Sequence, residues 1–241
     1  MACAKGPDPS EDAVAAGGAR VAVADGASSS WEAGRWSQAL VDAWVKASDD
    51  DEAWLTAAQR QFSAAMPDSP GELAWLEEAA AQRGAHAAFL GLEVFDEVAH
   101  LRWRARSVGD VTAAVVHRDA VVEVFPDPED HGFGSHPPLV SSLQPTQAVA
   151  DQHESTLADG EVLLVMTDAV AEYVVTSAEP AALATLAGGT SDAITGLLSR
   201  AGRAGDIEVD DLTLLRLRRR VSEEGRTGSW SDRTASAAGS G

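Results

Sequence analysis

The chain has 241 residues, of which 38 are acidic and 18 are Lys or Arg, so its formal net charge is −20. Proteins that bind nucleic acid or anionic membranes need basic surfaces, and this charge argues against both partners. Hydrophobic residues make up 45% of the chain, which is enough for a buried core in one domain or two small ones. The single cysteine, Cys3, excludes an internal disulfide framework.

Neither a secretory signal nor a membrane span is evident from the sequence. The first residues lack the apolar core of a signal peptide. The longest apolar runs are short, and VLLVM at 162–166 is typical of their length. A spanning helix needs about 18 apolar residues in succession. We therefore expect a soluble, cytoplasmic protein.

The first part of the chain predicts one strand followed by helices. Residues 1–9 are rich in Pro, Gly and Ala, and we expect a flexible N-terminus there. The apolar run at 19–26 ends in Asp-Gly, which is typical of a buried strand that enters a turn. Ser28–Ser30 are candidate N-caps for the next helix. Helices are expected at 31–47, at 51–65 and from Pro70 onward.

The middle of the chain changes to strand patterns. Residues 86–95 are almost continuously apolar, and residues 100–110 alternate Leu, Trp and Ala with Arg. The segment 112–125 predicts two strands around a tight turn, so the three segments together indicate an antiparallel meander. Residues 126–160 contain many prolines, histidines and serines, and we expect a long irregular loop there.

The last part of the chain combines strands with helices. The run at 161–168 predicts a buried strand that ends in Asp, and the segment 210–220 predicts a final strand. Between them, helices are expected within 169–201. The tail at 221–241 is rich in Ser and Gly, and we expect it to be disordered. Because strands and helices are segregated along the chain, the predicted fold class is α+β.

Acidic side chains lie at the edges of several predicted strands. Asp25 and Asp168 end two of them, Asp210 begins another, and Glu11-Asp12 precedes the first. Single aspartates are common in turns, so the set is informative only if the fold brings the residues together. Carboxylates gathered in one place repel each other unless a cation neutralises them, and Mg²⁺ and Mn²⁺ are suitable partners.

Five short blocks in this order resemble the metal-dependent type-2C Ser/Thr protein phosphatases, the PPM family, and above all their compact bacterial members. The blocks are SEDA at 10–13, VAVADG at 21–26, VGD at 108–110, LLVMTDAVAEYVV at 163–175 and DDLTLLRLR at 210–218. Each block is weak by itself, whereas the ordered set is fairly specific. The resemblance covers residues 10–220, which we expect to form the phosphatase-like domain.

This resemblance implies a four-layer αββα sandwich, in which two antiparallel sheets pack face to face and are flanked by helices. It implies a serine/threonine phosphoprotein phosphatase that hydrolyses phosphate monoesters through a water bridging two Mg²⁺ or Mn²⁺ ions. The substrate would be a phosphorylated protein, namely a kinase or a kinase target.

The resemblance also assigns metal ligands and catalytic residues. By motif match, Asp25 bridges the two ions, the Gly26 carbonyl binds one of them, and Asp168 and Asp210 complete the other coordination sphere. Asp25 and Asp168 are accordingly the implied catalytic residues.

Three further acidic residues have more peripheral roles in the same scheme. Glu11 and Asp12 are implied to act on the ions directly or through ordered water. Asp110 matches a position that helps to hold a weaker third ion in some members of the family.

Two departures from the family pattern lead to an alternative hypothesis. The family often has a phosphate-binding arginine shortly before its Asn-Glu-Asp block, but residues 5–9 contain none. The glycines that usually follow Asp-Gly are replaced by Ala27 and Ser28–Ser30. The alternative is a weak or inactive pseudophosphatase that acts as a regulatory binding module.

Overall fold

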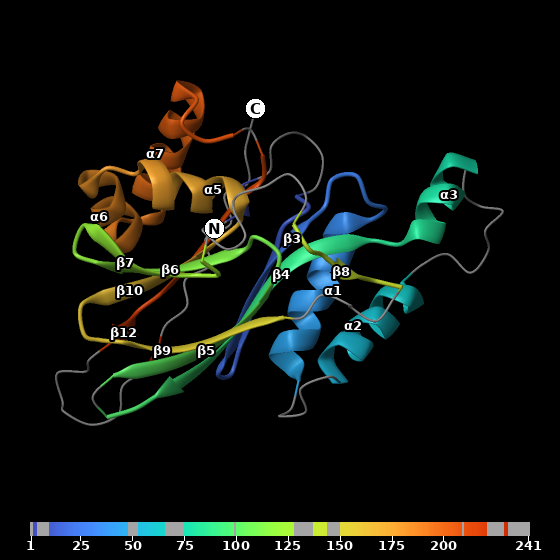
Figure 1. Cartoon of the computed structure of the whole chain (residues 1–241), viewed down its shortest axis with the longest axis horizontal. Coiled ribbons are helices and arrows are strands. Elements are labelled where there is room, and N and C mark those ends of the chain that lie inside the picture. Colours follow the sequence, from blue (N-terminus) through green and yellow to red (C-terminus); the bar gives the residue numbers. More distant parts are fainter. Residues whose placement is uncertain are drawn as a thin grey trace.

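The computed structural model of the chain describes residues 2–3, 10–47, 53–65, 75–98, 100–127, 137–143, 150–208, 210–220 and 229–230. Three predictions fall almost entirely outside these residues. They are the flexible N-terminus at 1–9, the first turn of the third helix at Pro70 and the disordered tail at 221–241. Figure 1 shows two sheets that are flanked by helices on their outer faces.

One sheet has six strands, all paired in antiparallel fashion. Its order is β2-β3-β4-β5-β9, with the short β8 paired to the beginning of β4. The strands are β2 (Ala13–Gly17), β3 (Arg20–Gly26), β4 (His86–Asp96), β5 (Leu101–Val108), β8 (Val140–Ser141) and β9 (Asp151–Leu157).

The other sheet has five strands in the order β1-β11-β10-β6-β7, and it is also antiparallel. The strands are β1 (Ala2–Cys3), β6 (Thr112–His117), β7 (Ala120–Phe125), β10 (Glu161–Met166) and β11 (Leu212–Leu217). A separate two-stranded ribbon is formed by β12 (Arg219–Arg220) and β13 (Ser229–Trp230).

Helices cover the outer face of each sheet (Figure 1). The six-stranded sheet packs against α1 (Ala33–Lys46) and α2 (Ala53–Ala64), while α3 (Trp75–Arg83) leads into β4. The five-stranded sheet packs against α5 (Asp168–Glu172), the π-helical turn η2 (Tyr173–Ser177), α6 (Pro180–Gly188) and α7 (Ser191–Ala204).

Three apolar clusters hold the four layers together. Between the sheets, inward side chains such as Leu90 and Trp103 meet Leu163 and Leu215 from the opposite sheet. The other two clusters lie between each sheet and its own helices. Strand residues alternate between faces, so one strand supplies two clusters, and β10 does this with a continuous apolar run. The structure therefore confirms the α+β class and the αββα sandwich.

Two expectations about local structure were wrong. The segment 126–160 is not one irregular loop, because β8 and β9 lie within it. In β9 the side chains alternate between half-buried and exposed positions, but nearly all of them are polar, so the usual apolar signal of a strand is missing. The serines at 28–30 do not cap α1: its N-cap is Glu32, in a left-handed conformation with φ of 53°.

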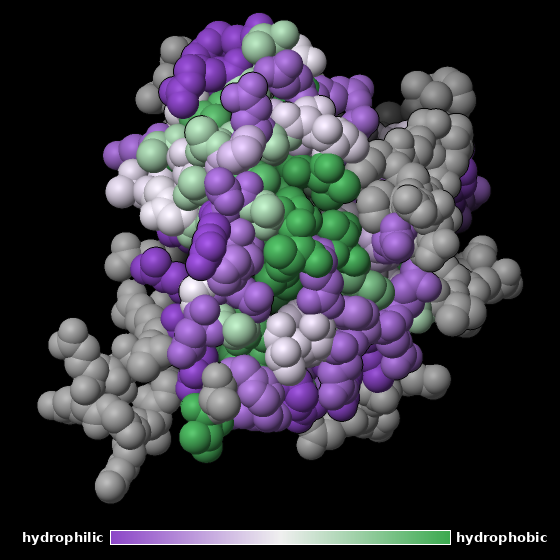
Figure 2. Space-filling view, turned by 60° about the vertical axis from the view of Figure 1, so that its left-hand side comes forward, coloured by the Kyte–Doolittle hydropathy of each residue, from purple (hydrophilic) through white to green (hydrophobic). Residues whose placement is uncertain are grey.

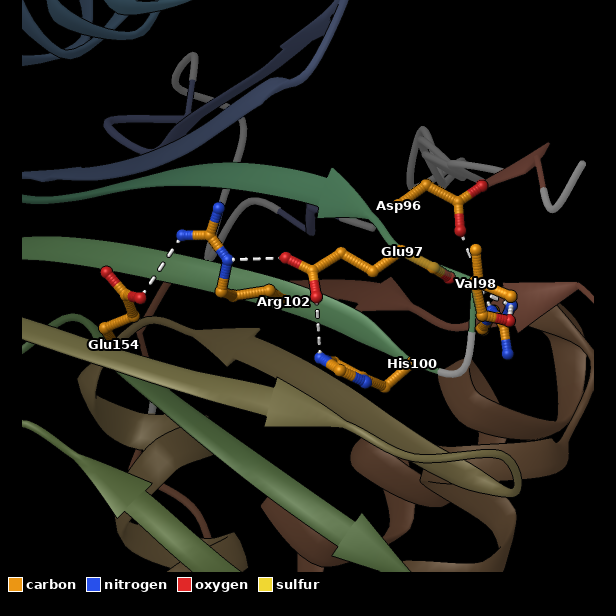
Figure 3. A network of polar contacts seen from close by, with 7 residues as sticks. Asp96, Glu97, Val98, His100, Arg102 and Glu154 are labelled. Atoms are coloured by element: carbon orange, nitrogen blue, oxygen red, sulfur yellow. Dashed lines mark hydrogen bonds and ion pairs between the residues drawn. The ribbon is translucent and has the colours of Figure 1, made fainter.

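A polar network fixes the far end of β4 (Figure 3). Arg102 donates to Glu97 at 2.8 Å and to Glu154 at 3.2 Å, and His100 pairs with the same Glu97 at 2.9 Å. Arg219, of which 10% is exposed, donates to the carbonyl oxygens of Glu97 and Val98 at 3.1 and 2.8 Å. The chain after β11 is thereby tied to the β4–β5 hairpin.

The surface is mostly hydrophilic, as the acidic composition requires. Figure 2 shows one face on which purple, hydrophilic side chains surround a smaller hydrophobic area. Large hydrophobic side chains that are strongly exposed include Val98 in the β4–β5 hairpin and Val122 on β7. Within the described residues, every helix is too short or too polar to cross a membrane.

Candidate metal centre

Five aspartates from distant parts of the sequence converge at one end of the two sheets. The charges that act on Asp25, at the end of β3, come from the other four members, namely Asp12, Asp110, Asp168 and Asp210. We call these five residues the aspartate cluster. The structure thus brings together five of the seven ligands that the sequence implied, while Glu11 and Gly26 are chain neighbours of the cluster.

Strand pairing explains why the cluster forms. In the five-stranded sheet, Met166 of β10 lies opposite both Thr112 of β6 and Leu214 of β11. Asp168 follows β10, while Asp110 and Asp210 precede β6 and β11. Because β10 is antiparallel to both neighbours, its end and their beginnings share one edge of the sheet. The packing of the sheets then places Asp25 of β3 above that edge.

Gly109 sets the position of Asp110 in the turn between β5 and β6. Its φ is +98°, a conformation that favours glycine, and a Cβ at this position would lie 2.6 Å from the Cβ of Ala88. Ala88 is the partner of Asp25 in the β3–β4 pairing. The close approach of Gly109 to Ala88 therefore brings Asp110 to the neighbourhood of Asp25.

Asp12 is held by a buried hydroxyl from the other sheet. The Thr167 hydroxyl donates to Asp12 Oδ2 at 3.3 Å and accepts from the Thr213 backbone N–H at 3.1 Å. Thr167, which directly precedes Asp168, is completely buried. Asp12 and Asp25 are also within hydrogen-bonding range of each other. These contacts link residues on both sheets at the cluster.

Glu11 is fixed by two contacts that the sequence did not reveal. Its backbone N–H donates to Asp211 Oδ2 at 2.7 Å, and its side chain accepts from the Ser28 hydroxyl at 2.5 Å. Asp211 is 5% exposed. In the sequence, Asp211 could have been noticed only as the neighbour of Asp210. The motif match assigned a role to Asp210 and none to Asp211.

Gly26 lies tightly against the segment that carries Glu11. A Cβ at Gly26 would be 2.8 Å from the backbone oxygen of Glu11 and 2.9 Å from both Ala33 Cβ and Ser37 Oγ. No side chain fits this contact without displacement of the backbone. The Asp-Gly sequence therefore serves packing here, in addition to any role of the Gly26 carbonyl.

Burial and mutual repulsion raise the pKa values of the cluster. For Asp25, burial is the main cause and the four neighbouring aspartates add to it, which raises its pKa to about 10. For Asp12, burial raises the pKa to about 7, and the charge of Asp211 contributes in the same direction. In the metal-free protein, these two carboxyls therefore hold protons at pH values where an exposed aspartate is ionised.

The outer members of the cluster are shifted in the same direction. Burial raises the pKa of Asp110 to about 6, with a further contribution from the charge of Asp168. Burial also raises the pKa of Asp168, although a hydrogen bond from the Ala169 backbone N–H opposes this change. The charged groups that contribute most to the raised pKa of Asp25 are all negative. The protein itself thus supplies little positive charge at the centre of the cluster.

The donor set fits a hard divalent cation. Carboxylate oxygens in excess, without a dominant basic partner, are the ligands that Mg²⁺ and Mn²⁺ prefer. Among the described residues, no three His, Cys, Asp or Glu side chains are already arranged around a common metal position. Carboxyls that hold protons must lose them to become metal ligands, so metal binding at the cluster would release protons.

Solved structures of similar architecture include serine/threonine phosphatases. The serine/threonine phosphatase PstP/Ppp of Mycobacterium tuberculosis is 18% identical, with a TM-score of 0.57 over 89% of this chain and 95% of that chain. The PstP catalytic domain in complex with two manganese ions gives the same identity and TM-score over 89% and 94%. Phosphatase Stp1 of Staphylococcus aureus is 16% identical, with a TM-score of 0.58 over 86% and 88%.

These similarities show the fold. Neither a protein-family model nor a curated protein sequence matches the chain. The chain therefore has the fold of the type-2C phosphatases, which confirms at the level of architecture the resemblance that the sequence motifs indicated.

Proposed function

We propose that this protein is a metal-dependent phosphoprotein phosphatase that hydrolyses phosphoserine and phosphothreonine esters. The observation that carries the proposal is the convergence of five aspartates at one end of the sandwich. The fold supports it, since the structures of similar architecture are Ser/Thr phosphatases and one of them contains two manganese ions. An acidic site of this kind has no other evident use in a phosphatase fold than cation binding.

The ligand scheme implied by the motifs is compatible with the placement of the residues. Asp25 lies centrally and would contact both ions, with the Gly26 carbonyl on one of them. When bound, the ions would supply a water of lowered pKa and neutralise the phosphoryl oxygens. The remaining proposed ligands are Asp168 and Asp210 for the second ion, Glu11 and Asp12 directly or through water, and Asp110 for a weaker third ion.

The contribution of the chain itself is orientation. Thr167 and Asp25 hold Asp12 from two sides, and Asp211 with Ser28 holds Glu11, so the N-terminal carboxylates cannot turn away freely. Phosphoryl transfer depends mainly on positioning and charge stabilisation, so such restraint is the chief requirement on the protein. Partners that orient metal ligands typically affect metal affinity or activity by about 10- to 100-fold.

The proposed substrate is a phosphorylated protein, either a kinase or one of its targets. The cluster lies at an end of the sandwich, where strands begin and end. The alternative, a weak or inactive pseudophosphatase that acts as a regulatory binding module, is favoured by two departures from the family pattern. The glycines that usually follow Asp-Gly are replaced by Ala27 and Ser28–Ser30. Residues 5–9 lack the arginine that binds phosphate in many type-2C phosphatases.

The decisive experiment is the release of phosphate from a phosphothreonine peptide, with Mn²⁺ or with EDTA. We expect turnover only with the metal, and a loss of at least about 100-fold in Asp25→Asn and Asp168→Asn because each removes a charged ligand. Asp119→Asn, an exposed residue in the β6–β7 turn, is the matched control and should keep full activity. Full activity in Asp25→Asn would contradict the metal assignment.

Calorimetric titration separates the two functions. A pseudophosphatase would bind Mn²⁺ through the aspartate cluster without hydrolysing any member of a phosphopeptide panel. A phosphatase would show both properties. If the wild-type protein neither bound the metal nor released phosphate, both functions would be wrong.

A further inference from the structure

A small pocket lies at the end of β3, where its lining begins at Ala27, two residues beyond Asp25. Its volume is about 220 Å³, which is below the range of about 300–1,000 Å³ typical of sites for larger ligands. Its walls come from the loop after β3, the last turn of α3, the first residue of β4 and the residue before β8. The side chains used below are Ser29, Trp31, Arg83, His86 and Leu139.

Strand pairing places this pocket beside Asp25. Asp25 pairs with Ala88, and the next contact outward is the hydrogen bond from the Ala27 N–H to the His86 carbonyl at 3.0 Å. Residues two apart along a strand share a face, so Asp25, Ala27, His86 and Ala88 face the same side of the sheet. A diagonal neighbour across such a pair is about 7–8 Å away. His86 is therefore the link between the cluster and the pocket.

The charge of Arg83 has no counterpart in the described part of the chain. Arg83 ends α3, its side chain is exposed, and it forms no hydrogen bond or ion pair with a described residue. By contrast, Arg102 and Arg104 on β5 form ion pairs with Glu97 and Glu154. A guanidinium without a described partner, in a pocket that begins two residues beyond Asp25, is suited to a phosphoryl group, which it can bind through two parallel hydrogen bonds.

The remaining walls fit the rest of a phosphorylated side chain. Trp31 and Leu139 provide apolar surface on which the methyl group and adjacent backbone of a phosphothreonine could pack, and Ser29 adds a hydroxyl. The Ser30 hydroxyl is already committed, because it accepts from the His86 N–H at 3.1 Å and donates to the His86 carbonyl at 3.3 Å.

We propose that Arg83 is the phosphate-binding residue of this protein and that its pocket receives the phosphorylated side chain of the substrate. This inference rests on the proposed function, since it assigns the substrate-binding part of the same site. It also explains how the chain can bind phosphate without an arginine at residues 5–9, because Arg83 at the end of α3 supplies the positive charge.

The test compares Arg83→Ala and Arg83→Lys with Arg60→Ala, an exposed arginine on α2 outside the pocket. For Arg83→Ala we expect KM for a phosphothreonine peptide and the inhibition constant of inorganic phosphate to rise together by about 10- to 100-fold. Lys keeps the charge but loses the planar fork, so it should restore part of this loss. Mn²⁺ affinity and Tm should match those of Arg60→Ala. Values of KM and inhibition constant within about twofold of wild type would overturn the proposal.

A binding measurement keeps this result separate from the proposed function. Inorganic phosphate is titrated calorimetrically into the Mg²⁺-loaded wild type and into Arg83→Ala. If the wild type hydrolyses no phosphopeptide but its phosphate binding is lost in Arg83→Ala, the phosphatase function fails and the pocket assignment stands. If phosphate binds equally to both proteins, or to neither, the assignment to Arg83 is wrong whatever the activity.

Discussion

Replacement of Asp110 by Asn should stabilise the metal-free protein. Asp110 is 8% exposed, and burial together with the charge of Asp168 raises its pKa to about 6 from an ordinary value of 3.8. The folded state therefore binds the Asp110 proton more tightly than the unfolded state does. Stability must then fall as the pH rises from 3.8 to about 6, and it stays low above that range.

The size of the effect follows from the difference between the two pKa values. One pKa unit corresponds to about 1.4 kcal/mol, so ionisation of Asp110 near neutral or alkaline pH costs the folded state about 3 kcal/mol. About half of this penalty remains near pH 5, since Asp110 is then mostly protonated when folded and mostly ionised when unfolded. Because the new amide must also be buried, we expect a net gain of about 1–3 kcal/mol at about pH 8.

Thermal unfolding followed by circular dichroism in EDTA measures this gain. For a chain of this length, 1 kcal/mol corresponds to about 2–4 °C in Tm, so Asp110→Asn should raise Tm by about 2–12 °C near pH 8 and by roughly half as much near pH 5. The exposed Asp119→Asn is the control and should change Tm little at either pH. A lower Tm for Asp110→Asn near pH 8, or a gain of equal size at both pH values, would refute the reasoning.

Substitutions at three further positions test the supports of the site and of the fold. Asp211→Ala removes the acceptor of the Glu11 N–H and should weaken Mn²⁺ binding by about 10- to 100-fold in a calorimetric titration, while Asp211→Asn retains part of the affinity. Gly109→Ala brings a Cβ to 2.6 Å from Ala88 and forces a φ of +98°, so phosphate release should fall together with Tm. Arg219→Ala should lower the free energy of urea unfolding by about 1–3 kcal/mol with KM unchanged, because its contacts lie after the last residue of β4, whereas Asp25 pairs with Ala88 near the first. A raised KM in Arg219→Ala would contradict that separation.

The sequence predicted an interior strand of each sheet. Residues 19–26 and 161–168 are continuous apolar runs that end in aspartate, and the structure has β3 and β10 there. Such runs carry a strong local signal because both faces of the strand are buried. The aspartate that ends each run was therefore located correctly at a strand end.

The edges of the six-stranded sheet could not be predicted in the same way. β2 consists of small residues, AVAAG, and its pairing with β3 is a tertiary effect without a period-2 pattern. β9 has polar residues on both faces, and its position is set by pairing with β5. Propensity and periodicity describe a segment alone, whereas these two strands depend on a partner strand.

For the site, the sequence identified metal-binding candidates but missed the residues that orient them. Asp25, Asp168 and Asp210 were found because they follow or precede apolar runs. Asp211 and Ser28 act through Glu11, about 200 and 17 residues away along the chain, and no pattern connects residues at such separations. The pocket around Arg83 was missed for the same reason, since its walls come from four separate segments.

The aspartate cluster is unfavourable for the fold in the absence of a cation, and the three apolar clusters have to compensate for it. Residues that repel each other come from both sheets: Asp25 follows β3, whereas Asp110, Asp168 and Asp210 border the strands of the other sheet. Where these carboxyls are ionised, their repulsion acts to separate the two layers that the apolar core between the sheets holds together, and in the metal-free protein the protons on Asp25 and Asp12 relieve part of it. A divalent cation bound there would reverse the sign of this force, because each ion would attract carboxylates from both sheets. Metal binding and the packing of the sheets are thus coupled.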